Sequence, residues 1–154
     1  MDEPLRNSTP AKKTAGEDLY RIVLVDDDAL FRHSLKKILQ ENRRLEVAGE
    51  AGDGLEFLEF LDSAGPTPDL AILDISMPRL GGIEATAKAK RAHPEMRVLV
   101  LSMHREKEYV CAAISAGADG YVLKEAADLE LFAAIEKIRW GGVYVSPLLG
   151  EENG

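Results

Sequence analysis

Three aspartates follow two short apolar segments and could together hold a metal ion. Residues 22–25 lead directly into Asp26 and Asp27, and residues 70–73 lead directly into Asp74. If both segments are buried parallel strands, their carboxyl ends meet at one rim of a sheet and bring the acids together. Repulsion and desolvation would then raise the pKa values of these carboxyl groups unless a cation lay among them. Carboxylate oxygens are ligands that suit Mg²⁺.

Two more polar residues would reach the same rim. Ser102 follows the apolar residues 98–101, and Lys124 follows residues 121–123. A carboxylate at the rim can act as a nucleophile and form an aspartyl phosphate, while Mg²⁺ would neutralise charge on the transferring oxygens. A hydroxyl and an ammonium group can hold the remaining phosphoryl oxygens. These residue types therefore predict phosphoryl transfer.

The elements that would position these side chains alternate along the chain. The uninterrupted apolar segments 22–25, 70–73 and 98–101 are typical of parallel strands covered on both faces, and residues 45–51 and 121–123 are weaker strand candidates. Between them, apolar residues recur at a spacing near 3.6, which is typical of helices that cover a core. This alternation predicts a parallel sheet with right-handed crossovers and helices on both faces.

The predicted fold is therefore α/β: a flavodoxin-like, doubly wound sheet of five parallel strands in the order 2-1-3-4-5, with five helices. In folds of this kind the active crevice lies beyond the carboxyl ends of the strands, at the switch point between the first and third strands. Asp26, Asp27 and Asp74 fall at that point.

The composition predicts one compact domain with loose ends. The chain has 154 residues, 45% of them hydrophobic, and a formal net charge of -8, which argues against direct contact with nucleic acid. We expect a flexible tail at residues 1–19, the domain at residues 20–141, and the start of a linker at residues 142–154. No segment approaches the ~20 apolar residues of a membrane helix, and no apolar signal segment is present, so we expect a cytoplasmic protein without membrane contact.

Several residues are expected to serve local structure rather than chemistry. Asp28 is expected to cap the first helix rather than to bind metal, and Asp128 to cap the last helix. Gly117 and Gly141 are expected to end helices, and Trp140 to pack at the base of the last one.

The arrangement resembles the receiver domains of two-component response regulators over residues 20–141. The resemblance is carried by the strings VDDD, LDISMP, LGG, LSMH and GADGYVLK, most of which stand at successive strand ends. It implies that Asp74 is the phosphoacceptor, that Asp27 binds Mg²⁺ directly, and that Asp26 binds it mainly through water. It also implies that the backbone carbonyl of Ser76 completes the protein's share of the metal shell.

Further roles follow from the same resemblance. Ser102 would be the switch hydroxyl, Tyr121 the switch aromatic, and Lys124 the salt-bridge partner of the phosphate. The positions that tune the rate of phosphoryl hydrolysis would be Ser76, Met103 and His104. Such a domain is a signalling phosphoacceptor rather than an enzyme, and it promotes only its own phosphorylation and dephosphorylation.

Other strings resemble the NarL/FixJ (LuxR-type) branch of these regulators: LFRHSLKKIL, SMH, GYVLKEA and GGVYVSP. Members of that branch carry a carboxyl-terminal helix-turn-helix domain, and no basic pair of helices follows here, so we expect a receiver fragment rather than a stand-alone receiver. The implied partners are a sensor histidine kinase, a second copy on phosphorylation, and DNA only through the output domain. The kinase is expected to contact the first helix at Leu30, Phe31 and Leu35.

Other functions fit parts of the pattern. In a haloacid-dehalogenase-type phosphatase, Asp26 would attack and Asp28 would act as acid and base, but Leu30 stands where that type prefers threonine or valine. A flavodoxin-like FMN binder needs a phosphate loop rich in backbone donors where this chain has aspartates. A pseudo-receiver that acts by protein contact alone stays open, although all the acids, the hydroxyl and the lysine are present.

Overall fold

The computed structural model describes residues 19–63 and 65–149. The predicted tail, except for residue 19, lies outside this part of the chain, as do residues 150–154 of the predicted linker. Among the residues described, no helix is long and apolar enough to cross a membrane.

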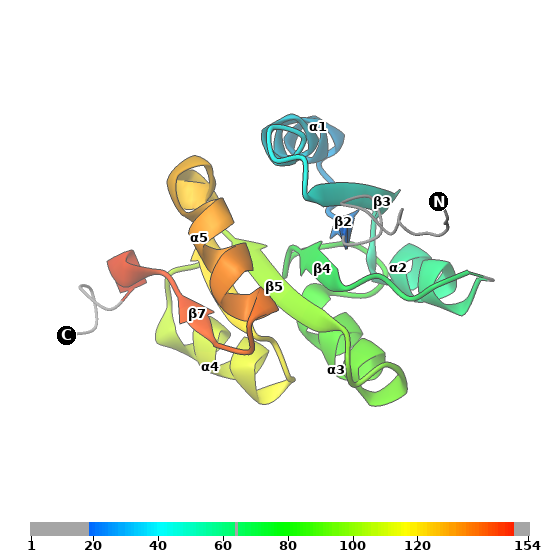
Figure 1. Cartoon of the computed structure of the whole chain (residues 1–154). Helices are drawn as coiled ribbons and strands as arrows, with labels where there is room; N and C mark the ends of the chain where they lie inside the picture. Colours follow the sequence, from blue (N-terminus) through cyan, green and yellow to red (C-terminus); the bar gives the residue numbers. More distant parts are fainter. Residues whose placement is uncertain (1–18, 64, 150–154) are drawn as a thin grey trace.

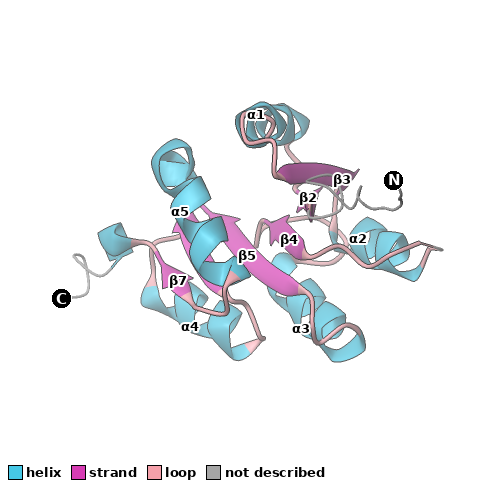
Figure 2. Cartoon of the chain, viewed as in Figure 1, coloured by secondary structure: helices cyan, strands magenta, loops and turns pink. Residues whose placement is uncertain are grey.

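A parallel sheet forms the centre of the molecule (Figure 2). Its strands are β2 (Tyr20–Val25), β3 (Leu45–Ala51), β4 (Leu70–Leu73), β5 (Arg97–Ser102), β6 (Gly120–Leu123) and β7 (Tyr144–Val145). They lie in the order β3-β2-β4-β5-β6-β7, which is the predicted order with one more strand at the edge. The predicted α/β class and strand order are confirmed, whereas the predicted number of strands is wrong.

Helices cover both faces of the sheet (Figure 1). On one face lie α1 (Ala29–Leu39) and α5 (Ala127–Arg139), and on the other lie α2 (Gly54–Asp62), α3 (Gly82–Ala92) and α4 (Lys107–Ser115). A short 3-10 turn, η2 (Lys124–Ala126), leads from β6 into α5. All the predicted helices are present, and the chain turns helical again at residues 147–149.

Strand β7 accounts for the difference between the predicted and the observed sheet. It has two residues, Tyr144 and Val145, which pair with the first two residues of β6. The side-chain hydroxyls of Tyr144 and Ser146 donate to the carboxylate of Glu130 on α5, at 3.2 and 3.1 Å. A strand of this length shows neither an apolar run nor alternation, so its pattern could not reveal it.

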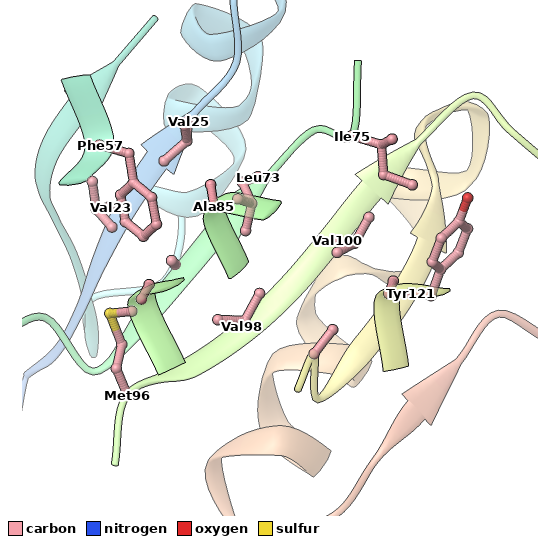
Figure 3. Packing of buried hydrophobic residues seen from close by; sticks show 14 of the residues in the cluster. Val23, Val25, Phe57, Leu73, Ile75, Ala85, Met96, Val98, Val100 and Tyr121 are labelled. Carbon is pink, nitrogen blue, oxygen red and sulfur yellow. The ribbon is translucent and has the colours of Figure 1, made fainter. Parts of the chain in front are cut away.

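Alternate side chains of the strands are buried against opposite helical layers. Val23 and Val25 belong to the cluster beneath α2 and α3, where Phe57 is fully buried (Figure 3). Ile22 and Leu24 of the same strand pack with α1 and α5. Complete burial of such a side chain contributes about 1.5–3 kcal/mol. The central strands therefore form a rigid platform for the residues at their carboxyl ends.

The two predicted helix caps have different outcomes. Asp28 caps α1 as predicted, because one of its carboxylate oxygens accepts hydrogen bonds from the backbone N–H groups of Leu30 and Phe31, each at 3.1 Å. The prediction for Asp128 is wrong, since it lies in the first turn of α5 and the N-cap residue is Ala126. The 3-10 turn runs straight into α5, without the extended residue that a capping side chain needs.

Helices α4 and α5 each end just before the glycine that was predicted to stop them. Gly117 and Gly141 have φ angles of 111° and 99°, which confirms that each ends a helix in the left-handed region. The prediction that Trp140 packs at the base of the last helix is wrong, because it is 73% exposed. Its indole N–H donates to the carboxylate of Glu136 on the same helix at 2.6 Å, so the ring lies along the helix surface.

Candidate functional site

The sheet brings Asp26, Asp27 and Asp74 to one rim. Val25 and Leu73 are paired in adjacent strands, so the residues that follow them leave the sheet side by side. The backbone N–H of Asp74 donates to the carbonyl of Val25 at 3.0 Å, which holds the two strand ends together. One carboxylate oxygen from each acid lies within 4.8 Å of the others. The three carboxylates are therefore close enough to share one ion.

The three aspartates differ in how far they are buried. Asp26 and Asp74 are 3% and 6% exposed, whereas Asp27 is exposed. Burial raises the pKa of Asp74 above its ordinary value and the charge of Asp26 raises it further, while Lys124 and a backbone hydrogen bond from Ser76 oppose the rise. Ionised Asp74 is therefore held at a cost in free energy that a bound cation would relieve.

Lys124 lies among these acids and is itself half enclosed. Its ammonium nitrogen is 2.8 Å from Oδ2 of Asp26 and 3.4 Å from Oδ2 of Asp74. It also lies 4.5 Å from the centre of the Phe31 ring, within the range of a cation–π contact. Burial acts to lower the pKa of Lys124, but the hydrogen bond of Asp26 and the charges of both acids outweigh it and raise the pKa. The lysine is therefore held in its charged form.

The donor set fits a divalent metal ion. Three carboxylates face one ammonium group, which leaves excess negative charge at the rim. Mg²⁺ usually keeps several waters and takes one or two carboxylates, so this cluster of oxygen donors suits it. Ser76 lies on the loop that leaves Asp74, and its backbone carbonyl stays a predicted further oxygen donor.

Ser102 and Tyr121 lie behind the acids with no exposed surface. Ser102 ends β5, and its hydroxyl oxygen accepts a hydrogen bond from the backbone N–H of His104 at 3.0 Å. Tyr121 pairs with Val100 across β6 and β5 and lies beside it in the core (Figure 3). Burial raises the pKa of the Tyr121 phenol, and a hydrogen bond with Ser102 partly opposes this. The two predicted switch residues are thus neighbours.

His104 connects the loop after β5 with the loop after β4. Its Nε2 lies 3.0 Å from the hydroxyl oxygen of Ser76, and its ring stacks on Tyr109 of α4 with the ring centroids 4.1 Å apart. Met103, next to it, is 78% exposed. The three residues predicted to tune turnover therefore lie on the two loops that leave β4 and β5.

Gly82 allows α3 to begin close to Asp74. Its N–H donates to the carbonyl of Ile75 at 2.9 Å. A Cβ atom built on Gly82 would lie 2.0 Å from the backbone carbonyl oxygen of Asp74, where no side chain fits. Glycine at this position therefore sets how closely the helix approaches the carboxylate.

Some contacts at the rim do not follow from the sequence pattern. The ring of Phe31 beside Lys124 and the ring of Tyr109 beside His104 each sit within a helical apolar pattern that is equally typical of core packing. The predicted kinase contact at Leu35 is corrected, because this residue is 3% exposed and lies in the core. Leu30, by contrast, is 76% exposed at the start of α1.

Comparisons with known proteins match this chain to response regulators. The family described as response regulator receiver domain matches residues 22–136. The transcriptional regulatory protein DegU of Brevibacillus brevis is 37% identical over 131 residues, which cover 85% of this chain and 55% of that protein. The response regulator GacA of Pseudomonas viridiflava is 33% identical over 134 residues, covering 87% of this chain and 62% of that protein. The chain thus spans somewhat more than half the length of these relatives.

A solved structure is similar over almost its whole length. The crystal structure of a two-component response regulator of the LuxR family from Aurantimonas sp. SI85-9A1 has 34% sequence identity and a TM-score of 0.81. The match covers 87% of this chain and 94% of that one.

Proposed function

Because this chain belongs to the receiver domains of two-component response regulators, in the LuxR-type (NarL/FixJ) branch, we propose that Asp74 accepts a phosphoryl group from the phosphohistidine of a sensor kinase. The observation that carries the proposal is the position of Asp74, a buried carboxylate between two further acids and the ammonium group of Lys124. It is a signalling domain, and the phosphoryl transfer that it promotes is onto itself.

In the proposed transfer, a carboxylate oxygen of Asp74 attacks the phosphorus atom and the nitrogen–phosphorus bond of the phosphohistidine breaks. The bonding electrons stay on the imidazole nitrogen of the kinase, and Asp74 becomes an acyl phosphate. Mg²⁺, when bound, neutralises charge on the transferring oxygens. Asp26, Asp27, Asp74 and the carbonyl of Ser76 would hold it, with Asp26 acting mainly through water.

Lys124 serves the same transfer from the other side. Before phosphorylation its ammonium group is shared between Asp26 and Asp74. The new phosphoryl oxygens offer it a partner with more charge than either carboxylate, and we expect Lys124 to turn toward them. The phosphate is thereby coupled to the loop between β6 and α5.

Ser102 and Tyr121 would turn the phosphate into a change of shape. The acyl phosphate carries about -1.5 to -2 of charge in place of the single charge of the carboxylate, and it adds strong acceptors. The Ser102 hydroxyl oxygen accepts from the N–H of His104, so we expect the loop after β5 to move when this hydroxyl turns to donate to the phosphate. Tyr121 would fill the space behind Ser102, and the face formed by α4, β6 and α5 would change. Phosphorylation shifts the two states only as far as its differential free energy allows.

The lifetime of the phosphate is proposed to depend on Ser76, Met103 and His104. They lie on the loops that border Asp74, and the exposed Met103 side chain could limit how water approaches the acyl phosphate. These residues adjust hydrolysis rather than acceptance of the phosphoryl group.

The remaining assignments concern the whole regulator. We propose that residues 20–141 form the receiver and that residues 142–154 begin a linker whose first residues add β7 to the sheet. The partners would be a sensor histidine kinase, which contacts the start of α1 around Leu30 and Phe31, and a second copy after phosphorylation. DNA would be bound only by a helix-turn-helix domain beyond this chain, in the cytoplasm.

A small phosphodonor with a nitrogen–phosphorus bond tests this function without the kinase. The chain is incubated with phosphoramidate and Mg²⁺ and weighed by intact-mass spectrometry, beside an Asp74→Asn variant and a sample with EDTA. The proposal predicts one added phosphoryl group in the wild type with Mg²⁺ and none in the two controls. Equal phosphorylation of Asp74→Asn would refute it, and a wild type that is never phosphorylated would favour a pseudo-receiver.

A further inference from the structure

The loop between β4 and α3, residues 75–81, contains a turn that is unfavourable for its central residue. Arg79 has a φ of 66°, the one positive value among the non-glycine residues that the structure describes. The N–H of Leu80 donates to the carbonyl of Pro78 at 2.7 Å, so Arg79 is the centre of a γ-turn. γ-turns with a positive central φ are rare and strained for a residue with a Cβ atom, so the surroundings must stabilise this one.

A buried carboxylate holds the strained turn in place. Nε of Arg79 donates to Oδ2 of Asp53 at 2.7 Å, and the Asp53 side chain is 8% exposed. The other Asp53 oxygen accepts from the N–H of Glu56 at 2.9 Å, which caps α2. Exposed ion pairs contribute little because both partners are mobile. Here one partner is buried and already fixed by the cap, so the pair has a defined geometry.

The backbone makes a second attachment beside this ion pair. The N–H of Gly54 donates to the carbonyl of Leu80 at 3.1 Å. A Cβ atom on Gly54 would lie 2.4 Å from that same oxygen, so the two loops are in close contact. The turn is thus attached at neighbouring points to the start of α2.

These attachments act on the loop that carries Ser76. Asp74 is fixed by β4, and the loop closes at its base through the hydrogen bond from Gly82 to Ile75. Between these points, Ser76 is attached to His104 on one side, at 3.0 Å, and Arg79 to Asp53 on the other. Loss of the Arg79 attachment would release one side of the loop and with it the backbone carbonyl of Ser76.

We infer that Arg79 is a positioning residue for the metal: its pair with Asp53 holds the loop so that the Ser76 carbonyl and the Asp74 carboxylate face the same ion. This inference rests on the proposed function, because it assumes that Mg²⁺ binds at Asp26, Asp27 and Asp74. Arg79 touches neither the ion nor the phosphoryl group. Its ion pair keeps the strained γ-turn closed, and without that pair the turn would open.

Mg²⁺ binding to the unphosphorylated chain tests the inference directly. MgCl₂ is titrated into ¹⁵N-labelled protein and the dissociation constant is read from amide shifts at the rim. We expect it to rise about tenfold in Arg79→Ala and in Asp53→Asn, since removing groups that orient metal ligands typically weakens binding ~10–100-fold. Asparagine keeps an oxygen to cap α2, so that variant removes only the ion pair with Asp53 and leaves the longer contact of Arg79 with Glu56 at 3.8 Å. The double variant should bind no more weakly than either single one.

Two further variants separate positioning from general stability. Arg21→Ala removes an arginine that lies 3.5 Å from Glu46, at the opposite ends of the strands, and should leave Mg²⁺ binding unchanged. Arg79→Gly lacks the ion pair but lets the turn form without strain, so it should bind Mg²⁺ more tightly than Arg79→Ala does. Unchanged Mg²⁺ binding in both Asp53→Asn and Arg79→Ala would overturn the inference and leave the proposed function standing. A wild type that binds no Mg²⁺ would overturn both.

Discussion

The hydroxyl of Tyr121 donates to the backbone carbonyl of His104 over 2.7 Å, from a ring with no exposed surface. His104 also donates its own N–H to Ser102, so one residue binds both of the proposed switch side chains. The loop after β5 is thereby tied to β6 before any phosphate is present. A change at Ser102 can therefore reach Tyr121 through His104 as well as through the hydrogen bond between the two side chains.

Removing only the Tyr121 hydroxyl should loosen this loop. Tyr121→Phe keeps the buried ring but removes the hydroxyl that binds His104 and Ser102, and we expect a loss of about 1–2 kcal/mol in the free energy of unfolding. Amide hydrogen exchange at residues 103–106 should become faster, while phosphorylation of Asp74 persists. Unchanged exchange in these residues would show that the hydrogen bond does not hold the loop.

Replacing Lys124 should make the folded chain depend more strongly on metal. Lys124→Ala leaves Asp26 and Asp74 buried near each other without their ammonium partner. Removing one partner of a buried pair costs about 3–5 kcal/mol, and Mg²⁺ should recover part of this. The rise in melting temperature on adding MgCl₂ should therefore be larger in Lys124→Ala than in the wild type. An equal rise in both proteins would contradict the claim that Lys124 and the metal ion compensate the charge of the same carboxylates.

The raised pKa of Asp74 predicts how stability changes with pH. An aspartate in the unfolded chain has a pKa of about 3.9, and the pKa of Asp74 in the folded chain is higher. Between these two pKa values the folded state binds more protons than the unfolded state. The free energy of unfolding therefore falls as the pH rises through this range. Asp74→Asn lacks this titration. Without divalent cations it should be more stable than the wild type at pH 7, and the difference should vanish toward about pH 3. Denaturant unfolding measures this, and a difference independent of pH would contradict it.

The close approach at Gly82 predicts a large effect from one methyl group. In Gly82→Ala the new Cβ would meet the carbonyl oxygen of Asp74 at 2.0 Å, so the backbone at Asp74 must shift. We expect destabilisation of more than about 2 kcal/mol, as for other overpacked sites, together with much slower phosphorylation. Gly52→Ala is the matched control, because its Cβ would meet only the flexible Glu56 carboxylate at 3.4 Å. Similar unfolding curves for the two variants would contradict the steric explanation.

Sequence alone predicts the centre of this molecule better than its margins. Runs such as residues 70–73 are typical of buried parallel strands, and in the predicted strand order the acids at their ends meet at one rim. Strand β7 was missed because two residues carry no pattern, and its position depends on Glu130, which lies on a separate helix. The prediction for Trp140 is wrong because its indole N–H has a partner on its own helix, and the ring stays exposed instead of packing at the helix base.

The loops show the same limit. Asp53 and Arg79 are 26 positions apart in sequence, and neither belongs to a motif that would pair them. A positive φ at arginine contradicts local preference, so only the folded chain reveals it. The contact of Ser76 with His104 likewise joins two loops whose distance depends on the sheet. Residue types at strand ends are thus predictable, whereas the contacts that orient them depend on tertiary structure.

The most direct test of the central claim is to identify which carboxylate carries the phosphoryl group. The chain is phosphorylated with acetyl phosphate and Mg²⁺, reduced with sodium borohydride, which converts an aspartyl phosphate to homoserine, and mapped by peptide mass spectrometry. We predict homoserine at position 74 alone, and none when EDTA is present. Homoserine at position 26 or 27 would contradict the assignment of Asp74 and favour a phosphatase-like site instead.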